Sequence, residues 1–212
     1  MSFAHGMNFY KLFFVFFLSC FIGVVVETLW CILKEHRVES RKGLVYGPFN
    51  LVYGFGGLWL TLALYPLREC SWIVVFIVGS IVGGIWEYLC SLFQEKVFGS
   101  VSWDYGEFYF NFHGRVTLLY SFFWGGLSLW WIKSAYPIMS SLVEMIPNRI
   151  GILFTWILLV FIVFDSVVSF FAVYRMNQRR KGEPARNSFM RWIDRYFTDA
   201  RLEKIYPNMM FK

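Results

Sequence analysis

Charged residues are scarce in this chain of 212 residues. They make up only 16% of it, while 58% of the residues are hydrophobic and 22% are aromatic. A soluble globule of this length needs more polar surface than such a composition can provide. The mean hydropathy of +0.51 therefore predicts an integral membrane protein with one compact membrane domain.

Several catalytic and metal-binding motifs are also missing. No G-x-x-x-x-G-K-[ST] sequence occurs, so the chain cannot hydrolyse ATP through a P-loop. Neither G-x-S-x-G nor H-E-x-x-H occurs, and the three histidines share no ligand spacing. We therefore expect no catalytic residue of these classes, no metal and no cofactor. A membrane component without catalytic activity is favoured over an enzyme.

Cysteine is rare too, with four residues in all. Three of them fall inside apolar runs and only Cys70 lies near a rim, so no extracellular set is available for disulfides. The net charge of +6 is explained by basic residues that flank the apolar runs. It requires no nucleic-acid partner.

Five apolar runs with few charges have the length of helices that cross a hydrocarbon core about 30 Å thick. They cover residues 9–33, 49–65, 71–93, 116–132 and 150–174. The fold class is therefore predicted to be all-α, with about five transmembrane helices. Placing the C-terminus inside leaves 16 of the 20 Lys and Arg residues on the cytoplasmic side. The positive-inside rule thus predicts a multi-pass protein of the inner or plasma membrane with its N-terminus outside.

The sequence resembles itself at a displacement of 60 positions. "FIGVVVETLWCILKE" (21–35) then falls on "IVGGIWEYLCSLFQE" (81–95), and the match continues without a gap into the following run. The paired positions are Gly23 with Gly83, Glu27 with Glu87, Leu29 with Leu89, Glu35 with Glu95, Gly54 with Gly114, and Leu58 with Leu118. This pattern predicts two parallel helix-loop-helix repeats related by an axis near the membrane normal.

The domain boundaries follow from that repeat. We expect a transmembrane domain over 1–175, with repeat A at about 13–66, repeat B at about 71–133 and an extra span at 150–174. A basic cytoplasmic tail, 176–212, comes after it. Within the tail, apolar residues at helical spacing over 187–204 predict an amphipathic helix that lies on the anionic leaflet, with docking to a soluble partner as the alternative.

Glu27 and Glu87 are predicted to lie in the cytoplasmic half of the membrane. An acid in a transmembrane helix costs a few kcal/mol, so it usually faces a partner, a cavity or a pathway. We expect the two side chains to face each other or one shared polar cavity. The alternative is that each carboxyl group only fixes helix packing through a hydrogen bond, and the same choice applies to Asp165.

The apolar chain is interrupted by helix breakers at "LVYGPFNLVYGFGG" (44–57). Broken backbone at membrane depth is tolerated only where protein or a water-filled cavity satisfies its polar groups. The segment "SVSWDYGEFYFNFHGR" (100–115) has the same character, so the two loops are expected to form one vestibule. The predicted pathway residues are Glu27, Glu87, Asp104, Asn111, Arg115, Arg41 and Lys42, and the predicted loop residues are Gly43, Gly47, Pro48, Tyr53, Gly54, Trp103, Tyr105 and Gly114.

Small residues in "GSIVGG" (79–84) let transmembrane backbones approach closely. We expect them to pack within the bundle, and self-association into a homo-oligomer through this face is left open.

A set of motifs resembles a known family. Glu27, "RKGLVYGP", "YGFG", Glu87, "EKVFGSVSWDY" and "NFHGR" are similar to the bacterial putative ABC transporter permease family labelled type IV, over roughly 13–133. Members usually carry an arginine immediately before the glycine, where this chain has Lys42 preceded by Arg41. They also often carry Cys-Pro where this chain has Phe49-Asn50-Leu51.

The resemblance implies a permease-like protein that moves a small solute or ion, with membrane lipid and a separate ATPase subunit as partners. Two alternatives stay open. One is a membrane-embedded enzyme for a lipid or lipid-linked substrate, with Glu27, Glu87 or Asp104 as acid or base. The other is a membrane scaffold or sensor that recruits partners through its basic tail.

Overall fold

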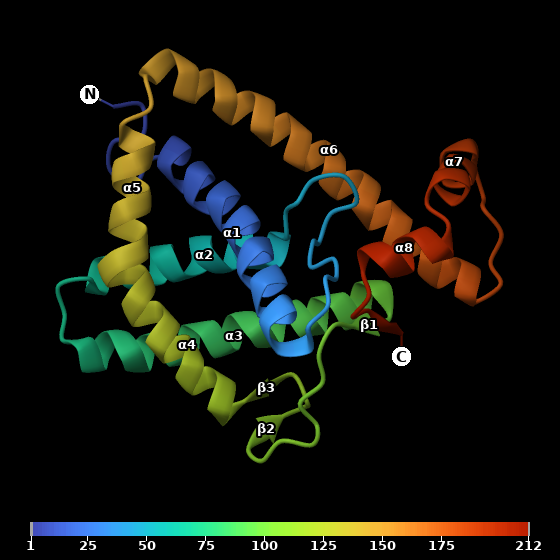
Figure 1. The fold of residues 1–212 in the computed structure, drawn as a ribbon, viewed down its shortest axis with the longest axis horizontal. Coiled ribbons are helices and arrows are strands. Elements are labelled where there is room, and N and C mark those ends of the chain that lie inside the picture. Colours follow the sequence, from blue (N-terminus) through green and yellow to red (C-terminus); the bar gives the residue numbers. More distant parts are fainter. Residues whose placement is uncertain (1, 212) are drawn as a thin grey trace.

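Helices make up most of the computed structural model, which describes residues 2–211 apart from the side chain of Glu35 (Figure 1). The helices are α1 (Phe9–Glu35), α2 (Leu51–Leu64), η1 (Tyr65–Leu67), α3 (Trp72–Phe98), α4 (Leu118–Trp130), η2 (Trp131–Ala135), α5 (Tyr136–Glu144), α6 (Asn148–Arg180), α7 (Ser188–Tyr196) and α8 (Asp199–Ile205). Four short strands form two antiparallel pairs: β1 (Ser100–Val101) with β4 (Met210–Phe211), and β2 (Asn111–Phe112) with β3 (Val116–Thr117).

Three helices, α1, α3 and α6, are long and apolar enough to cross a membrane. This finding supports the predicted membrane protein. The second predicted span corresponds to α2 and η1, which together form a shorter apolar helix. The fourth corresponds to α4 and its continuation, so the count of five spans stays a prediction.

The segment between the fourth and fifth predicted spans is not a loop, because α4 continues through η2 into α5, and only 145–147 separate α5 from α6. Pro137 lies at the start of α5. A proline inside a helix has no N–H to donate, and its ring collides with the carbonyl of the preceding turn. The wider π turn of η2 lies just before this proline and lets the helix continue past it.

Side-chain caps mark where the long helices begin. Asn8, Ser71 and Asn187 accept backbone N–H bonds at the starts of α1, α3 and α7. Helices α1 and α3 both end in a left-handed residue, His36 with φ 54° and Gly99 with φ 62°. These ends confirm that the apolar runs are helical almost to their polar flanks.

Small residues bring α1 against α2 and α3 against α4. A Cβ added to Gly23 would lie 2.2 Å from Tyr53 Cγ, and one added to Gly83 would lie 2.4 Å from Trp124 Cγ. Further matching contacts join Gly54 to Phe16 and Cys20, Gly125 to Phe76 and Ser80, Gly57 to Ser19, and Gly79 to Ser128. The small residues of "GSIVGG" therefore serve close packing within the bundle.

In these contacts, residues of α1 correspond to residues of α3 that lie 60 positions later in the chain. Residues of α2 correspond to residues of α4 that lie 71 positions later. The predicted ungapped match of Gly54 with Gly114 is therefore wrong. Gly114 lies in the loop before β3, with φ +67°, while Gly54 lies inside α2. Corresponding positions are therefore 11 residues further apart along the chain in the second pair, while the connection itself, 99–117 against 36–50, is longer by four residues.

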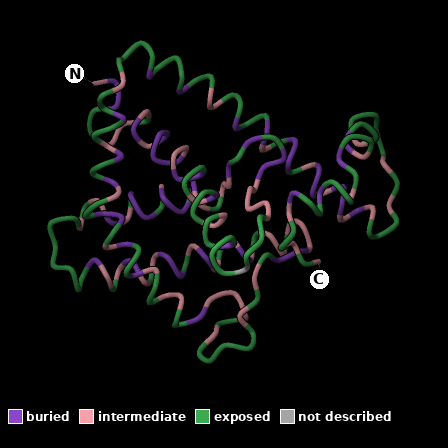
Figure 2. The backbone as a smooth tube through the Cα atoms, in the orientation of Figure 1, coloured by how far each residue is buried: buried purple, intermediate pink, exposed green. Residues whose placement is uncertain are grey.

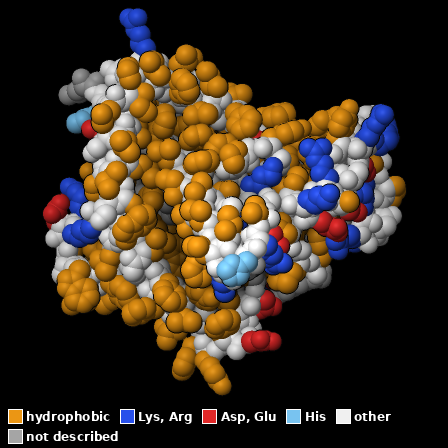
Figure 3. Space-filling model, in the orientation of Figure 1, with side chains coloured by type: hydrophobic (Ala, Val, Ile, Leu, Met, Phe, Trp, Pro, Cys, Tyr) orange, Lys and Arg blue, Asp and Glu red, His pale blue; other side chains and the backbone are white. Residues whose placement is uncertain are grey.

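Exposed apolar side chains cover much of the bundle (Figures 2 and 3). Such coverage is typical of helices that meet lipid. Charged side chains instead gather toward α7, α8 and the end of α6, on the right of Figure 3. In Figure 1 the N-terminus and the turn between α5 and α6 lie at the opposite end from this charged region.

The tail folds back onto α6 as two short helices. Ile193, Phe197 and Leu202 are fully buried in a cluster that also contains Val168 and Ala172 of α6. The prediction of one amphipathic helix over 187–204 is therefore wrong, because this segment forms two helices, α7 and α8. Much of their apolar surface covers the protein itself. Phe189, Trp192 and Tyr196 remain partly exposed, so contact of α7 with lipid stays a prediction.

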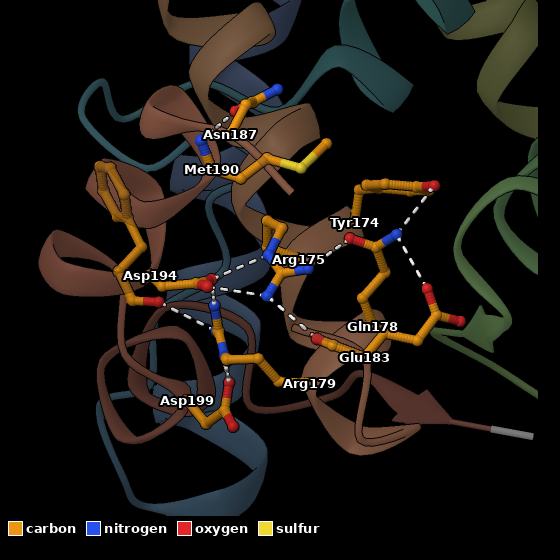
Figure 4. Close-up of polar contacts among 10 residues, drawn as sticks. Tyr174, Arg175, Gln178, Arg179, Glu183, Asn187, Met190, Asp194 and Asp199 are labelled. Carbon is orange, nitrogen blue, oxygen red and sulfur yellow. Dashed lines mark hydrogen bonds and ion pairs between the residues drawn. The ribbon is translucent and has the colours of Figure 1, made fainter. Parts of the chain in front are cut away.

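Ion pairs fix this packing (Figure 4). The buried Arg175 donates to both carboxylate oxygens of Asp194, at 3.0 and 2.7 Å, and Arg179 bonds Asp194 and Asp199. Burial alone would raise the pKa of Asp194, but the bonds from Arg175 and Arg179 outweigh it and hold that pKa below its usual value. The tail is thus a packed part of the fold.

Candidate functional site

Asp165 explains how the helix-breaking stretch is accommodated. This fully buried acid of α6 accepts the backbone N–H of Tyr46 on Oδ1 at 3.1 Å and that of Gly47 on Oδ2 at 2.7 Å. Ser169, one turn later, donates to Asp165 and accepts the N–H of Val45 at 2.8 Å. The broken backbone therefore obtains its hydrogen bonds from α6, as the low-dielectric surroundings require.

Glu27 of α1 has one hydrogen-bond donor among the described residues. The hydroxyl of Tyr53, from α2, donates to its Oε1. The side chain of Glu27 is partly exposed and lines a cavity. One oxygen of this carboxylate is thus held by the bundle.

Glu87 of α3 is more completely enclosed. Tyr105 donates to its Oε1 at 2.8 Å, and Trp124 of α4 donates to its Oε2 at 3.1 Å. Only 9% of the residue is exposed. Both carboxylate oxygens are satisfied, so this acid acts as a packing element between α3, α4 and the loop that carries Tyr105.

The cavity has a volume of about 760 Å³. Its walls come from α2, α3 and α6, the loop after α1, Ser102 and Trp103 after β1, and the tail segment 205–209. Apolar and aromatic side chains form most of the wall, while Glu27, Arg41 and Lys42 lie at a polar part of it. Both interhelical loops contribute, as the predicted vestibule requires.

The predicted site residues divide into two groups. Those that line the cavity are Glu27, Arg41, Lys42, Gly43, Tyr53 and Trp103. Those that do not line it are Glu87, Asp104, Asn111, Arg115, Gly47, Pro48, Gly54, Tyr105 and Gly114. Glu27 lines this cavity and Glu87 does not, so a polar cavity shared by the two acids stays a prediction.

The residues of the second loop hold its own conformation. Asp104 accepts the N–H of Gly106 at 2.8 Å, and the N–H of Tyr105 donates to the carbonyl of Gly114 at 2.7 Å. Asn111 donates to the carbonyl of Phe108 at 2.8 Å, and Arg115 pairs with Glu95 of α3 at 2.6 Å. This network aims the hydroxyl of Tyr105 at Glu87.

The first loop places its cations beside the cavity. Lys42 Nζ donates to the carbonyl of Val45 at 2.8 Å, and Arg41 pairs with Glu39 at 3.4 Å. Burial lowers the pKa of Lys42, while the nearby Asp165 carboxylate partly offsets that effect. The loop thus brings positive charge close to Glu27.

Some cavity residues carry no signal in the sequence. Leu89, Phe93 and Phe170 are ordinary apolar residues of membrane helices, and only the packing shows that they line a cavity. The tail contributes through the pairing of β4 with β1, and the hydroxyl of Tyr206 donates to the carbonyl of Gly43 at 3.3 Å. Within the described residues, no group of three or more His, Cys, Asp or Glu side chains could hold a metal ion.

Comparison with known proteins gives a family for this arrangement. The model of a family described as "Putative ABC-transporter type IV" matches residues 14–170. The chain belongs to this family. The match covers most of α1 through most of α6, which includes both loops and the cavity wall except Val173 and the tail segment. No curated protein and no solved structure matches the chain.

Proposed function

We propose that this member of the type IV family is the membrane subunit of a transporter, and that a solute binds in the cavity beside Glu27. The observation that carries the proposal is the cavity itself. About 760 Å³ of space lies between apolar helices, with an acid and two cations in its lining. Sites for small molecules are usually concave and apolar, with a few polar groups placed to orient the ligand.

A separate ATPase supplies the energy in this proposal, because the chain has no P-loop. The family supports such a partner. The loops after α1 and α3 and the basic tail lie on the cytoplasmic side of the inner or plasma membrane, as the positive-inside rule favours. The helix pairs α1–α2 and α3–α4 are then two parallel repeats, with α6 as an additional span.

The test uses inverted membrane vesicles from cells that produce the chain together with the host ATPases. Vesicle contents are compared by mass spectrometry with and without ATP. We expect at least one compound to accumulate only with ATP, and Glu27→Gln to abolish that accumulation. Glu69→Gln is the matched control, because Glu69 lies in the connection between α2 and α3 with 87% of its side chain exposed.

Two outcomes would contradict the proposal. If no compound responds to ATP in vesicles that contain the folded chain, the protein is not a transporter subunit of this kind. If a lipid-linked compound is chemically converted without ATP, and Glu27→Gln stops the conversion, the membrane-embedded enzyme is the better account.

A further inference from the structure

The wall of the cavity continues onto the outer surface of the bundle. Five of its apolar side chains keep more than a third of their surface exposed. They are Val52 at 37%, Phe55 at 47%, Leu89 at 45%, Phe93 at 58% and Phe170 at 39%. Because they belong to apolar helices of a membrane protein, the cavity opens toward lipid between these helices.

Part of the lining is polar. It includes Glu27, whose carboxylate accepts a hydrogen bond from Tyr53, and Lys42, whose Nζ donates to the carbonyl of Val45. A small hydrated solute would lose its hydration against the aromatic walls without replacing it there. A molecule with a polar head and an apolar chain would satisfy both parts of the lining.

The tail restricts the alternative route from water. Residues 205–209 line the cavity, and the strand that follows them is held by its pairing with β1. Tyr206 is tied to the first loop through the carbonyl of Gly43. The side toward the bilayer is therefore the more open approach.

We infer that the solute of this cavity is a single-chain amphiphile that enters sideways from the bilayer. Its chain lies along Leu89, Phe93 and Phe170, and its head lies beside Glu27 and Lys42. The volume of about 760 Å³ is within the range of sites for drug-sized ligands, roughly 300–1,000 Å³. The inference rests on the proposed function, in which this cavity is the solute site.

Photo-cross-linking tests the inference. The whole chain is placed in phosphatidylcholine nanodiscs. The probe is lysophosphatidylcholine that carries a diazirine on its acyl chain. Its zwitterionic head suits a cavity lining that contains both signs of charge. After illumination, labelled peptides are mapped by mass spectrometry. We expect saturable labelling of α3 near Leu89 and Phe93 and of α6 near Phe170, which an excess of unlabelled lysophosphatidylcholine removes.

A pair of matched variants separates the cavity from the general lipid surface. Leu89→Trp adds a ring inside the cavity, and we expect it to reduce saturable labelling about tenfold. Leu127→Trp makes the same change on α4, where Leu127 is exposed at 41% and does not line the cavity, so labelling should be unchanged. If Leu89→Trp does not fold, competition on the wild-type chain still decides the question.

The results also separate this inference from the proposed function. Labelling that is equal on all exposed helix faces, and that excess unlabelled probe does not reduce, would overturn the amphiphile site. ATP-dependent accumulation of a water-soluble solute that lysophosphatidylcholine does not inhibit would overturn it as well, while leaving the transporter intact. Saturable cavity labelling without any ATP-dependent movement would support the site and overturn the transporter.

Discussion

The helix pairs α1–α2 and α3–α4 pack through corresponding glycines, yet their glutamates have different surroundings. Tyr53 and Trp124 hold corresponding places, each against a glycine and each donating to the acid of its pair. Glu87 receives a second donor, Tyr105, from the longer connection after α3. Glu27 has no such donor in the described residues and lines the cavity instead. The two acids therefore share a packing role, while only Glu27 lines the cavity.

The largest effect should come from deleting each carboxylate. Glu87→Ala would leave two donors, Tyr105 and Trp124, without their acceptor. Unpaired buried groups cost about 1–3 kcal/mol each, so we expect a loss of about 3–5 kcal/mol in the free energy of unfolding, against about 1 kcal/mol for Glu27→Ala. Unfolding in nanodiscs, followed by circular dichroism, would measure both. Equal losses would mean that the two acids do not differ as described.

The shared feature of the two pairs is tested at their glycines. Gly23→Ala and Gly83→Ala should each lower the free energy of unfolding by about 1–3 kcal/mol, because the new methyl group overlaps Tyr53 or Trp124. Gly126→Ala on α4 is the control, since a Cβ there meets nothing within 4 Å. The same unfolding measurement applies. A clear difference between the first two variants would show that only one pair is closely packed.

A narrower change isolates the extra donor. Tyr105→Phe removes one hydroxyl and leaves Glu87 with a single donor, as Glu27 has. Hydrogen bonds to charged groups contribute about 1.5–3 kcal/mol, so the loss of stability should be near the lower end, with helix content unchanged. Protection of the loop residues 104–114 from hydrogen exchange should fall as well. Unchanged protection would mean that Tyr105 does not tie this loop to α3.

How far the sequence could predict this fold depended on the signal each element carries. Apolar runs located the long helices because the thickness of a bilayer fixes the length of a span. The displacement of 60 was right for α1 and α3, but glycine matches in the following loop, such as Gly54 with Gly114, hid a shift of 11 residues. Glycine is common at both helix contacts and turns, so identity alone did not separate these two uses.

The candidate site was less predictable. Glu27, Arg41 and Lys42 could be named because polar residues are costly beside a membrane, and the structure places all three in the cavity lining. The tail was misjudged because an amphipathic pattern does not reveal which apolar surface it covers. Ile193 and Phe197 pack on α6, and ion pairs such as the one between Arg175 and Asp194, 19 positions apart, hold them there.

The anchoring of the first loop by Asp165 also has a consequence for biosynthesis. The N–H of Gly47 bonds to an acceptor 118 positions later in the chain. When α1 and α2 leave the ribosome, the partners of residues 45–47 have not yet been made. The first loop must therefore wait in a hydrated state until α6 is inserted, and the polar end of the cavity is completed only at the last stage of synthesis.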